Sequence, residues 1–141
     1  MSPVKALDLR HLSKSPNEAV SMIVTEFGKV YVTAITRDGC SGCEEQKPLF
    51  GQLAQRMDVA HGVKVAFSNI HVQHVAGDLE QSEDAKRTFG HGSYPTYMVH
   101  VKSKYGPLEH YRAVYPGMGE LEKQIVAALE LAEHYKNQAE T

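Results

Sequence analysis

The two cysteines of the chain lie two residues apart, as Cys40-Ser41-Gly42-Cys43, and they are its only cysteines. Residues 30–35, just before them, are apolar and mostly β-branched, which predicts a buried strand. Apolar side chains at helical spacing follow, which predicts a helix. A cysteine at such a turn lies at the amino-terminal end of the helix, where free N–H groups and the helix dipole stabilise a thiolate. The pair is therefore interpreted as a dithiol–disulfide redox motif.

A second apolar segment, residues 63–70, predicts a strand that completes a βαβ unit with a right-handed crossover. Upstream, Ser15-Pro16-Asn17-Glu18 predicts a helix that begins with a capping box and ends near Gly28. The remaining pattern predicts a short helix over 82–89, strands over 97–101 and 108–114 joined at Gly106, and a last helix over 119–135. These elements indicate an α/β fold.

Two side-chain placements follow from periodicity. The helix after the cysteines is expected to present one apolar stripe, formed by Leu49, Phe50, Leu53 and Met57. In the strand over 97–101, alternation places His100 and Lys102 opposite Val99 and Val101, so both polar side chains are expected to face solvent.

Length and composition are those of one domain. The chain has 141 residues, of which 42% are hydrophobic, enough to form a core without disulfide staples. We expect a single domain over 1–141, with a core over about 15–135 and a polar, frayed tail over 136–141.

Charge and hydropathy exclude several classes of partner. The net charge of -2 argues against binding to nucleic acid or to an anionic membrane. No apolar segment is long enough to span a membrane, and residues 1–15 lack the apolar core of a secretory signal. We therefore expect a cytoplasmic protein, in which a close cysteine pair is catalytic or metal-binding rather than a structural staple.

The order of elements resembles the thioredoxin superfamily, over about Ser15 to Ala132. Pro48 follows Cys43 by five residues, as a kinking proline does in thioredoxins. Tyr94-Pro95-Thr96 is similar to the segment that holds the cis-proline of the family, and its form resembles catalytic domains of protein disulfide isomerases. The resemblance implies a central mixed sheet flanked by helices on both faces, with an N-terminal helix and a lengthened loop before the cis-proline.

The resemblance also implies a mechanism. Cys40, expected to be the more exposed sulfur, attacks a substrate disulfide and forms a mixed disulfide, and Cys43 then attacks Cys40 and releases the substrate. An extended substrate would lie along the cis-proline segment. The implied substrate contacts are Gly42, Tyr94, Pro95 and Thr96.

No cofactor or metal is expected beyond the Cys40–Cys43 pair. The implied partners are proteins or peptides that contain disulfides, and an upstream reductase or small-molecule thiol. Glu44 and Glu45 place negative charge near Cys40, which weakens thiolate stabilisation and favours a reductase. An isomerase or oxidase that uses the same pair is the near alternative, supported by the Tyr-Pro-Thr segment.

The sequence departs from the family at several points, of which three concern the cysteines and the groove. Ser41-Gly42 replaces the inner Gly-Pro of thioredoxins. The buried carboxylate that accepts a proton near the second cysteine would fall at Ala34, which cannot do so. The glycine that flattens the substrate groove after the last strand has no clear match, although Val114 falls nearest and Gly117 follows.

Histidines leave further alternatives open. His91 lies four residues before Pro95, where it could transfer protons or tune the cysteines. Cys40, Cys43, His71 and His91 could together bind zinc. A third class is a redox-inactive module that binds extended peptides beside Pro95.

Overall fold

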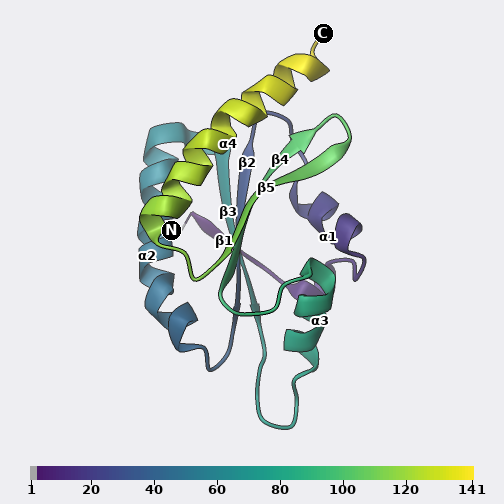
Figure 1. Cartoon of the computed structure of the whole chain (residues 1–141), viewed down its shortest axis with the longest axis vertical. Coiled ribbons are helices and arrows are strands. Elements are labelled where there is room, and N and C mark those ends of the chain that lie inside the picture. Colours follow the sequence, from purple (N-terminus) through teal and green to yellow (C-terminus); the bar gives the residue numbers. More distant parts are fainter. Residues whose placement is uncertain (1–2) are drawn as a thin grey trace.

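The computed structural model describes residues 3–141 (Figure 1). The strands are β1 (Val4–Leu7), β2 (Val30–Arg37), β3 (Val65–Val72), β4 (Thr96–Ser103) and β5 (Gly106–Val114). The helices are α1 (Pro16–Ile23), α2 (Ser41–His61), α3 (Glu80–Phe89) and α4 (Met118–Ala139), with short 3-10 turns at Leu9–His11 and Gly62–Lys64.

The strands form one mixed sheet in the order β1-β3-β2-β4-β5. β1 and β2 run parallel to β3, whereas β4 is antiparallel to both β2 and β5. The β-branched run of β2 lies at the centre, where its first six residues are buried. Continuous burial is expected of a strand that is covered on both faces.

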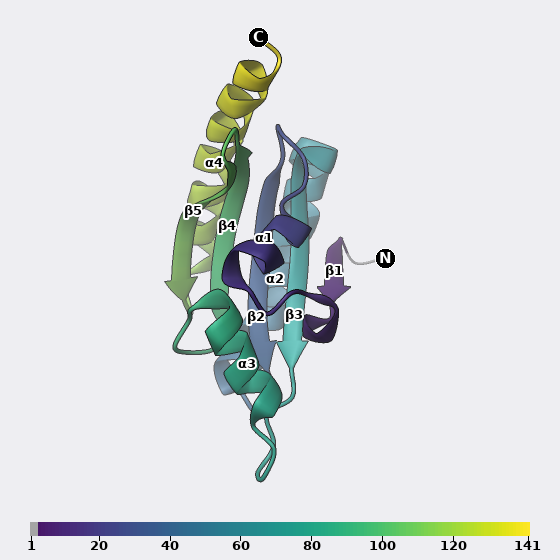
Figure 2. The same ribbon diagram turned by 90° about the vertical axis from the view of Figure 1, so that its right-hand side faces the viewer.

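Helices cover both faces of the sheet (Figure 2), which confirms the predicted α/β architecture. α2 and α4 lie on one face and α1 and α3 on the other. Alternation along β2 divides the core between them, because Val32 packs on the α2 side and Ile35 on the α3 side.

β1 is an element that the sequence did not predict. Val4 to Leu7 pair in parallel with Phe67 to Ile70 of β3, and so extend the sheet by one edge strand. Val4 packs against the α2-side core and Leu7 against the α3-side core. The ordered core therefore begins well before residue 15, and α4 continues through the expected tail as far as Ala139.

The first helix is shorter than expected and lacks the predicted capping box. α1 ends at Ile23, and the Ser15 side chain makes no cap hydrogen bond. The Glu18 carboxylate instead accepts a hydrogen bond from Ser13 at 2.7 Å. This pairing occupies the side chain that the capping box required.

Two side-chain placements were wrong. Leu49 is 44% exposed, because the buried stripe of α2 runs instead through Cys43, Gln46, Phe50, Leu53, Ala54 and Met57. His100 is only 4% exposed, because β4 is an inner strand with helices over both of its faces. Burial lowers the pKa of His100 to about 4, despite the nearby Glu109 carboxylate.

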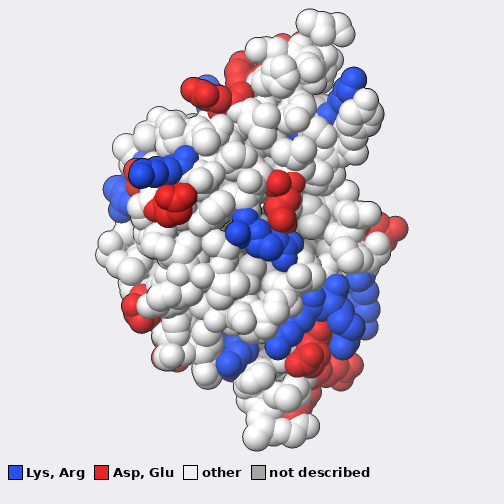
Figure 3. Space-filling model, viewed as in Figure 1, with Lys and Arg blue, Asp and Glu red and all other residues white. Residues whose placement is uncertain are grey.

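Surface charge is mixed in sign. On the face drawn in Figure 3, acidic and basic side chains lie in small adjoining groups. Within residues 3–141, no helix has both the length and the apolar character needed to cross a membrane.

Candidate active site

Cys40 and Cys43 are joined by a disulfide at the start of α2, with their Cα atoms 5.2 Å apart. Cys40 is the N-cap residue, and its sulfur accepts a hydrogen bond from the Cys43 N–H at 3.1 Å. Such a donor at a helix amino terminus also stabilises negative charge on Cys40 in the reduced pair. The expected difference in exposure is absent, since Cys40 is 6% and Cys43 5% exposed.

The loop before β4 lies beside this turn. The Tyr94–Pro95 peptide bond is cis. A Cβ atom placed on Gly42 would lie 3.4 Å from Pro95 Cδ, so the two loops are in close contact. Gly42 and Pro95, expected to bind substrate, therefore adjoin the disulfide.

Tyr94 and Thr96 are held inside this loop. The Tyr94 hydroxyl donates a hydrogen bond to the Ser82 carbonyl of α3 at 2.7 Å, and burial raises its pKa to about 12. Thr96 is fully buried, and its hydroxyl donates to the Ser93 carbonyl at 2.7 Å. Both side chains thus fix the shape of the Pro95 loop, and Thr96 has no surface to offer a substrate.

Tyr115 is a site residue that sequence reasoning missed. It follows β5 with a φ of 49°, the left-handed conformation that favours glycine. Its ring would lie 3.0 Å from a Cβ atom on Gly42, and its N–H donates to the Pro95 carbonyl at 3.0 Å. Tyr115, rather than Val114, therefore occupies the position at which the family resemblance implies a groove glycine. In the sequence, the only indication of this was the lack of a matching glycine after the last strand.

Two side chains of α2 tie the Tyr115 segment to the cysteine helix. The Tyr115 hydroxyl donates to the Glu45 carboxylate, which raises the tyrosine pKa. The buried Gln46 amide donates to the Pro116 carbonyl at 2.7 Å. α2, the Pro95 loop and the segment after β5 therefore form one connected unit. Glu45 is engaged in this unit rather than simply solvated.

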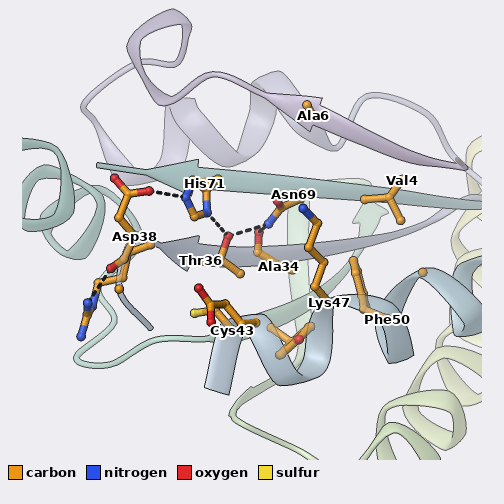
Figure 4. Close-up of a pocket in the computed structure, with 15 residues that line it drawn as sticks. Val4, Ala6, Ala34, Thr36, Asp38, Cys43, Lys47, Phe50, Asn69 and His71 are labelled. Atoms are coloured by element: carbon orange, nitrogen blue, oxygen red, sulfur yellow. Dashed lines mark hydrogen bonds and ion pairs between the residues drawn. The ribbon is translucent and has the colours of Figure 1, made fainter. Parts of the chain in front are cut away.

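A cavity of about 640 Å³ lies between α2 and the sheet, and Cys43 lines it (Figure 4). Ala34, Ala6 and Gly51 also line it, and these small residues leave the space unfilled. Ala34 is buried and shares the cavity with Cys43, so the position that lacks a carboxylate does adjoin the second cysteine. His71 lines the same cavity.

His91 is buried in the Pro95 loop. Its Nδ1 lies 3.1 Å from the Ser93 carbonyl, and its ring meets the Tyr94 ring edge-on at 4.8 Å between centroids. Burial lowers its pKa to about 4, and its Nε2 has no hydrogen-bond partner among residues 3–141. His91 is therefore neutral near pH 7 and supports Tyr94.

The structure does not bring the four proposed zinc ligands together. His71 is hydrogen-bonded to Thr36 and Asp38, whereas His91 contacts Ser93 and Tyr94. Across the described part of the chain, no three His, Cys, Asp or Glu side chains gather as metal ligands do.

No protein-family model matches the sequence, and no curated protein matches it significantly. Solved structures are similar over nearly the whole chain. Thioredoxin from Trichomonas vaginalis has a TM-score of 0.64 at 13% identity, covering 90% of this chain and 98% of its own. Thioredoxin from Malassezia sympodialis has a TM-score of 0.59 at 20% identity, covering 92% of this chain and 93% of its own. The thioredoxin NaTrxh from Nicotiana alata has a TM-score of 0.57 at 21% identity, covering 90% of this chain and 95% of its own. The protein therefore has the thioredoxin fold that its sequence predicted.

Proposed function

We propose that the protein is a thiol–disulfide oxidoreductase that reduces disulfides in proteins or peptides, acting as one domain over residues 1–141. The observation that carries this proposal is the Cys40–Cys43 disulfide, placed at the start of α2 and beside Pro95. A cysteine pair in this position can open and close without rearranging the fold, because both sulfurs belong to the same helical turn.

The reaction proceeds in two exchanges. The Cys40 thiolate attacks a substrate disulfide, which forms a mixed disulfide and frees one substrate thiol. Cys43 then attacks Cys40, which closes the Cys40–Cys43 bond and frees the second thiol. The substrate gains two electrons and the pair loses them. An upstream reductase or small-molecule thiol restores the dithiol, and no other cofactor takes part.

The substrate is expected to bind as an extended segment beside Pro95. We expect Gly42 and Pro95 to form the floor of this site, with the Tyr115 ring over Gly42, and Tyr94 to form its edge. Thr96 and His91 act from behind, by holding the Pro95 loop in place. We assign His91 this supporting role rather than proton transfer, because a pKa lowered to about 4 makes its buried imidazole a weak base near pH 7.

Reduction, in a reducing compartment such as the cytoplasm, is the proposed direction. Glu44 lines the cavity beside Cys43, and Glu45 lies at the same end of α2. Both acidic side chains therefore disfavour negative charge on the Cys40 thiolate, which makes the disulfide a poorer oxidant. Arg37 carries a positive charge at the same end of the cavity, where its guanidinium donates to the Asp38 carbonyl at 2.7 Å and lies over the Tyr94 ring.

A glutathione redox titration tests the proposal, with the thiol state of Cys40 and Cys43 read by alkylation and mass. A reversible two-electron transition near about −270 mV supports a reductase, and one near about −180 mV supports an isomerase or oxidase. A pair that does not cycle at any potential excludes the enzyme. Peptide binding that survives Cys40→Ser would then indicate a binding module, and stoichiometric zinc lost on alkylation would indicate a metal protein.

A further inference from the structure

Four polar side chains of β2, β3 and the turn after β2 form a hydrogen-bonded chain along the cavity that Cys43 lines (Figure 4). His71 Nε2 lies 2.8 Å from Asp38 Oδ1, and His71 Nδ1 lies 2.9 Å from Thr36 Oγ1. The Asn69 amide donates to Thr36 Oγ1 and to the Ala34 carbonyl, both at 3.0 Å.

The register of the sheet explains this grouping. Thr36 pairs with His71 and Ala34 with Asn69 across the parallel strands. Because side chains alternate along a strand, Thr36, Ala34, His71 and Asn69 lie on the face that packs against α2. Thr36 and His71 are next to last in β2 and β3, where the apolar core gives way to solvent, and Asp38 follows in the turn after β2. Cys43 reaches the same space from the first turn of α2.

The hydrogen bonds have a fixed direction. An ionised carboxylate only accepts, so His71 donates from Nε2 to Asp38 and keeps Nδ1 as an acceptor. Thr36 must then donate its hydroxyl proton to His71 Nδ1, while its oxygen accepts from Asn69. A hydroxyl oxygen has two lone pairs, so one lone pair of Thr36 is left to accept a proton from a donor in the cavity.

We propose that Thr36, His71 and Asp38 form the proton acceptor for Cys43, in place of the carboxylate that Ala34 does not supply. This inference rests on the thiol–disulfide exchange proposed above. It concerns only the second exchange, in which Cys43 must lose its proton before it attacks.

The step balances in protons and electrons. The Cys43 thiol gives its proton to Thr36 Oγ1, directly or through water in the cavity, and Thr36 passes its own proton to His71 Nδ1. The Cys43 sulfur then bonds to Cys40, and the electrons of the Cys40–substrate bond leave with the substrate thiolate. That thiolate takes up a proton from solvent. His71, whose side chain is 51% exposed, returns its proton to solvent.

The charges around His71 favour this role. The Asp38 carboxylate faces His71 Nε2, and the pKa of Asp38 is lowered by hydrogen bonds from His71 and from the His74 N–H. Other charged or titratable groups near this chain are Glu44 and Lys47 of α2, Arg37 of β2, Tyr97 of β4 and the His74 ring, of which the first four line the cavity. His74 Nδ1 is engaged by Ser82 at 2.8 Å.

Stopped-flow kinetics on the full chain separate the two exchanges. A fluorescent peptide disulfide reacts first with reduced Cys43→Ser protein, which measures attack by Cys40 alone. The same peptide is then mixed with reduced protein that retains Cys43, and the rate at which the second substrate thiol is released is measured between pH 5.5 and 9. We expect His71→Gln and Thr36→Val to slow release by at least tenfold near pH 7 and to move its pH profile to higher pH, with attack by Cys40 unchanged.

Matched variants keep the test sharp. Thr36→Ser retains a hydroxyl and should release the second thiol at the wild-type rate. If Thr36 mattered only for packing, Thr36→Ser and Thr36→Val would slow release to a similar extent. His110→Gln removes an imidazole that is paired with Gln124 and does not line the cavity, and it should leave both exchanges unchanged. Wild-type release rates and pH profiles in both His71→Gln and Thr36→Val would overturn the inference. Failure of Cys40 to attack any disulfide would instead overturn the proposed function.

Discussion

At the scale of single residues, the site is shaped by what replaces the expected side chains. Alanine at position 34 leaves a cavity beside Cys43, and tyrosine at position 115 covers Gly42 where a glycine would leave the groove open. Ala34 affects the surroundings of Cys43, and Tyr115 affects the groove beside Gly42. Neither residue disturbs the N-cap geometry of Cys40. Single substitutions can therefore test them separately.

Ala34→Asp supplies the absent carboxylate within the cavity. We expect turnover with a disulfide substrate to rise severalfold near pH 7, because a buried base can take the Cys43 proton. The new carboxylate should also make release independent of His71, so that adding His71→Gln costs little. Steady-state reduction of a disulfide protein, with and without His71→Gln, measures both effects. Unchanged turnover would count against a role for position 34.

Tyr115→Gly removes the ring over Gly42 and relieves the positive φ, which costs a non-glycine residue on the order of 1 kcal/mol. The groove beside Pro95 then widens. We expect kcat/KM to rise for a folded protein substrate relative to a small aromatic disulfide. Glu45→Gln, which keeps the ring in place, is the control. An equal effect on both substrates would show that Tyr115 does not gate the groove.

At the scale of elements, the start of α2 depends on contacts that lie far away in the sequence. The Gln46 side chain is 4% exposed and is the buried link from α2 to Pro116. This link holds the segment after β5 against the cysteine turn. The apolar stripe of α2 anchors the rest of the helix to the sheet.

Gln46→Ala should lower the free energy of unfolding by about 1–3 kcal/mol, because it leaves the buried Pro116 carbonyl without its donor. Urea unfolding of the oxidised protein measures the loss. Gln52→Ala, an exposed position on the same helix, is the control and should change stability by less than about 0.5 kcal/mol. Equal stabilities of the two variants would contradict a structural role for the Gln46–Pro116 bond.

At the scale of the whole molecule, two buried histidines couple stability to pH. His91 supports the Pro95 loop and His100 lies in β4, and burial lowers the pKa of each to about 4. Both rings are therefore neutral in the folded protein near pH 7. In the unfolded chain each would take up a proton at about pH 6.5.

Acidification should therefore destabilise the fold well before carboxylates protonate. A lowered folded-state pKa contributes stability that is present above about pH 6.5 and is lost as the pH falls towards 4. The loss is at most about 3 kcal/mol for each histidine, at about 1.36 kcal/mol per pKa unit. Urea unfolding between pH 4 and 7.5 measures it. In His100→Phe, the change in the free energy of unfolding between pH 7.5 and 4 should be about half that of the wild type. A wild-type stability that does not change over this pH range would contradict the prediction.

Local patterns in the sequence determined much of the fold and part of the site. The β-branched run at 30–35, the cysteine turn and Pro95 predicted β2, α2 and β4 in their observed order, because strand and helix periodicity is written in nearby residues. The adjacency of Cys40, Cys43, Gly42 and Pro95 followed from the family resemblance, and the structure places them together.

Only the tertiary structure decided the rest, since it depends on long-range pairing. β1 has only four residues, too few for a periodic pattern to predict a strand. It forms because its backbone pairs with the free edge of β3. His100 is buried because helices cover both faces of β4, which alternation cannot reveal. The Asp38–His71–Thr36–Asn69 chain needs the register of β2 on β3, and the cover by Tyr115 needs the path of the chain after β5. Their roles come from neighbours that are distant in the sequence.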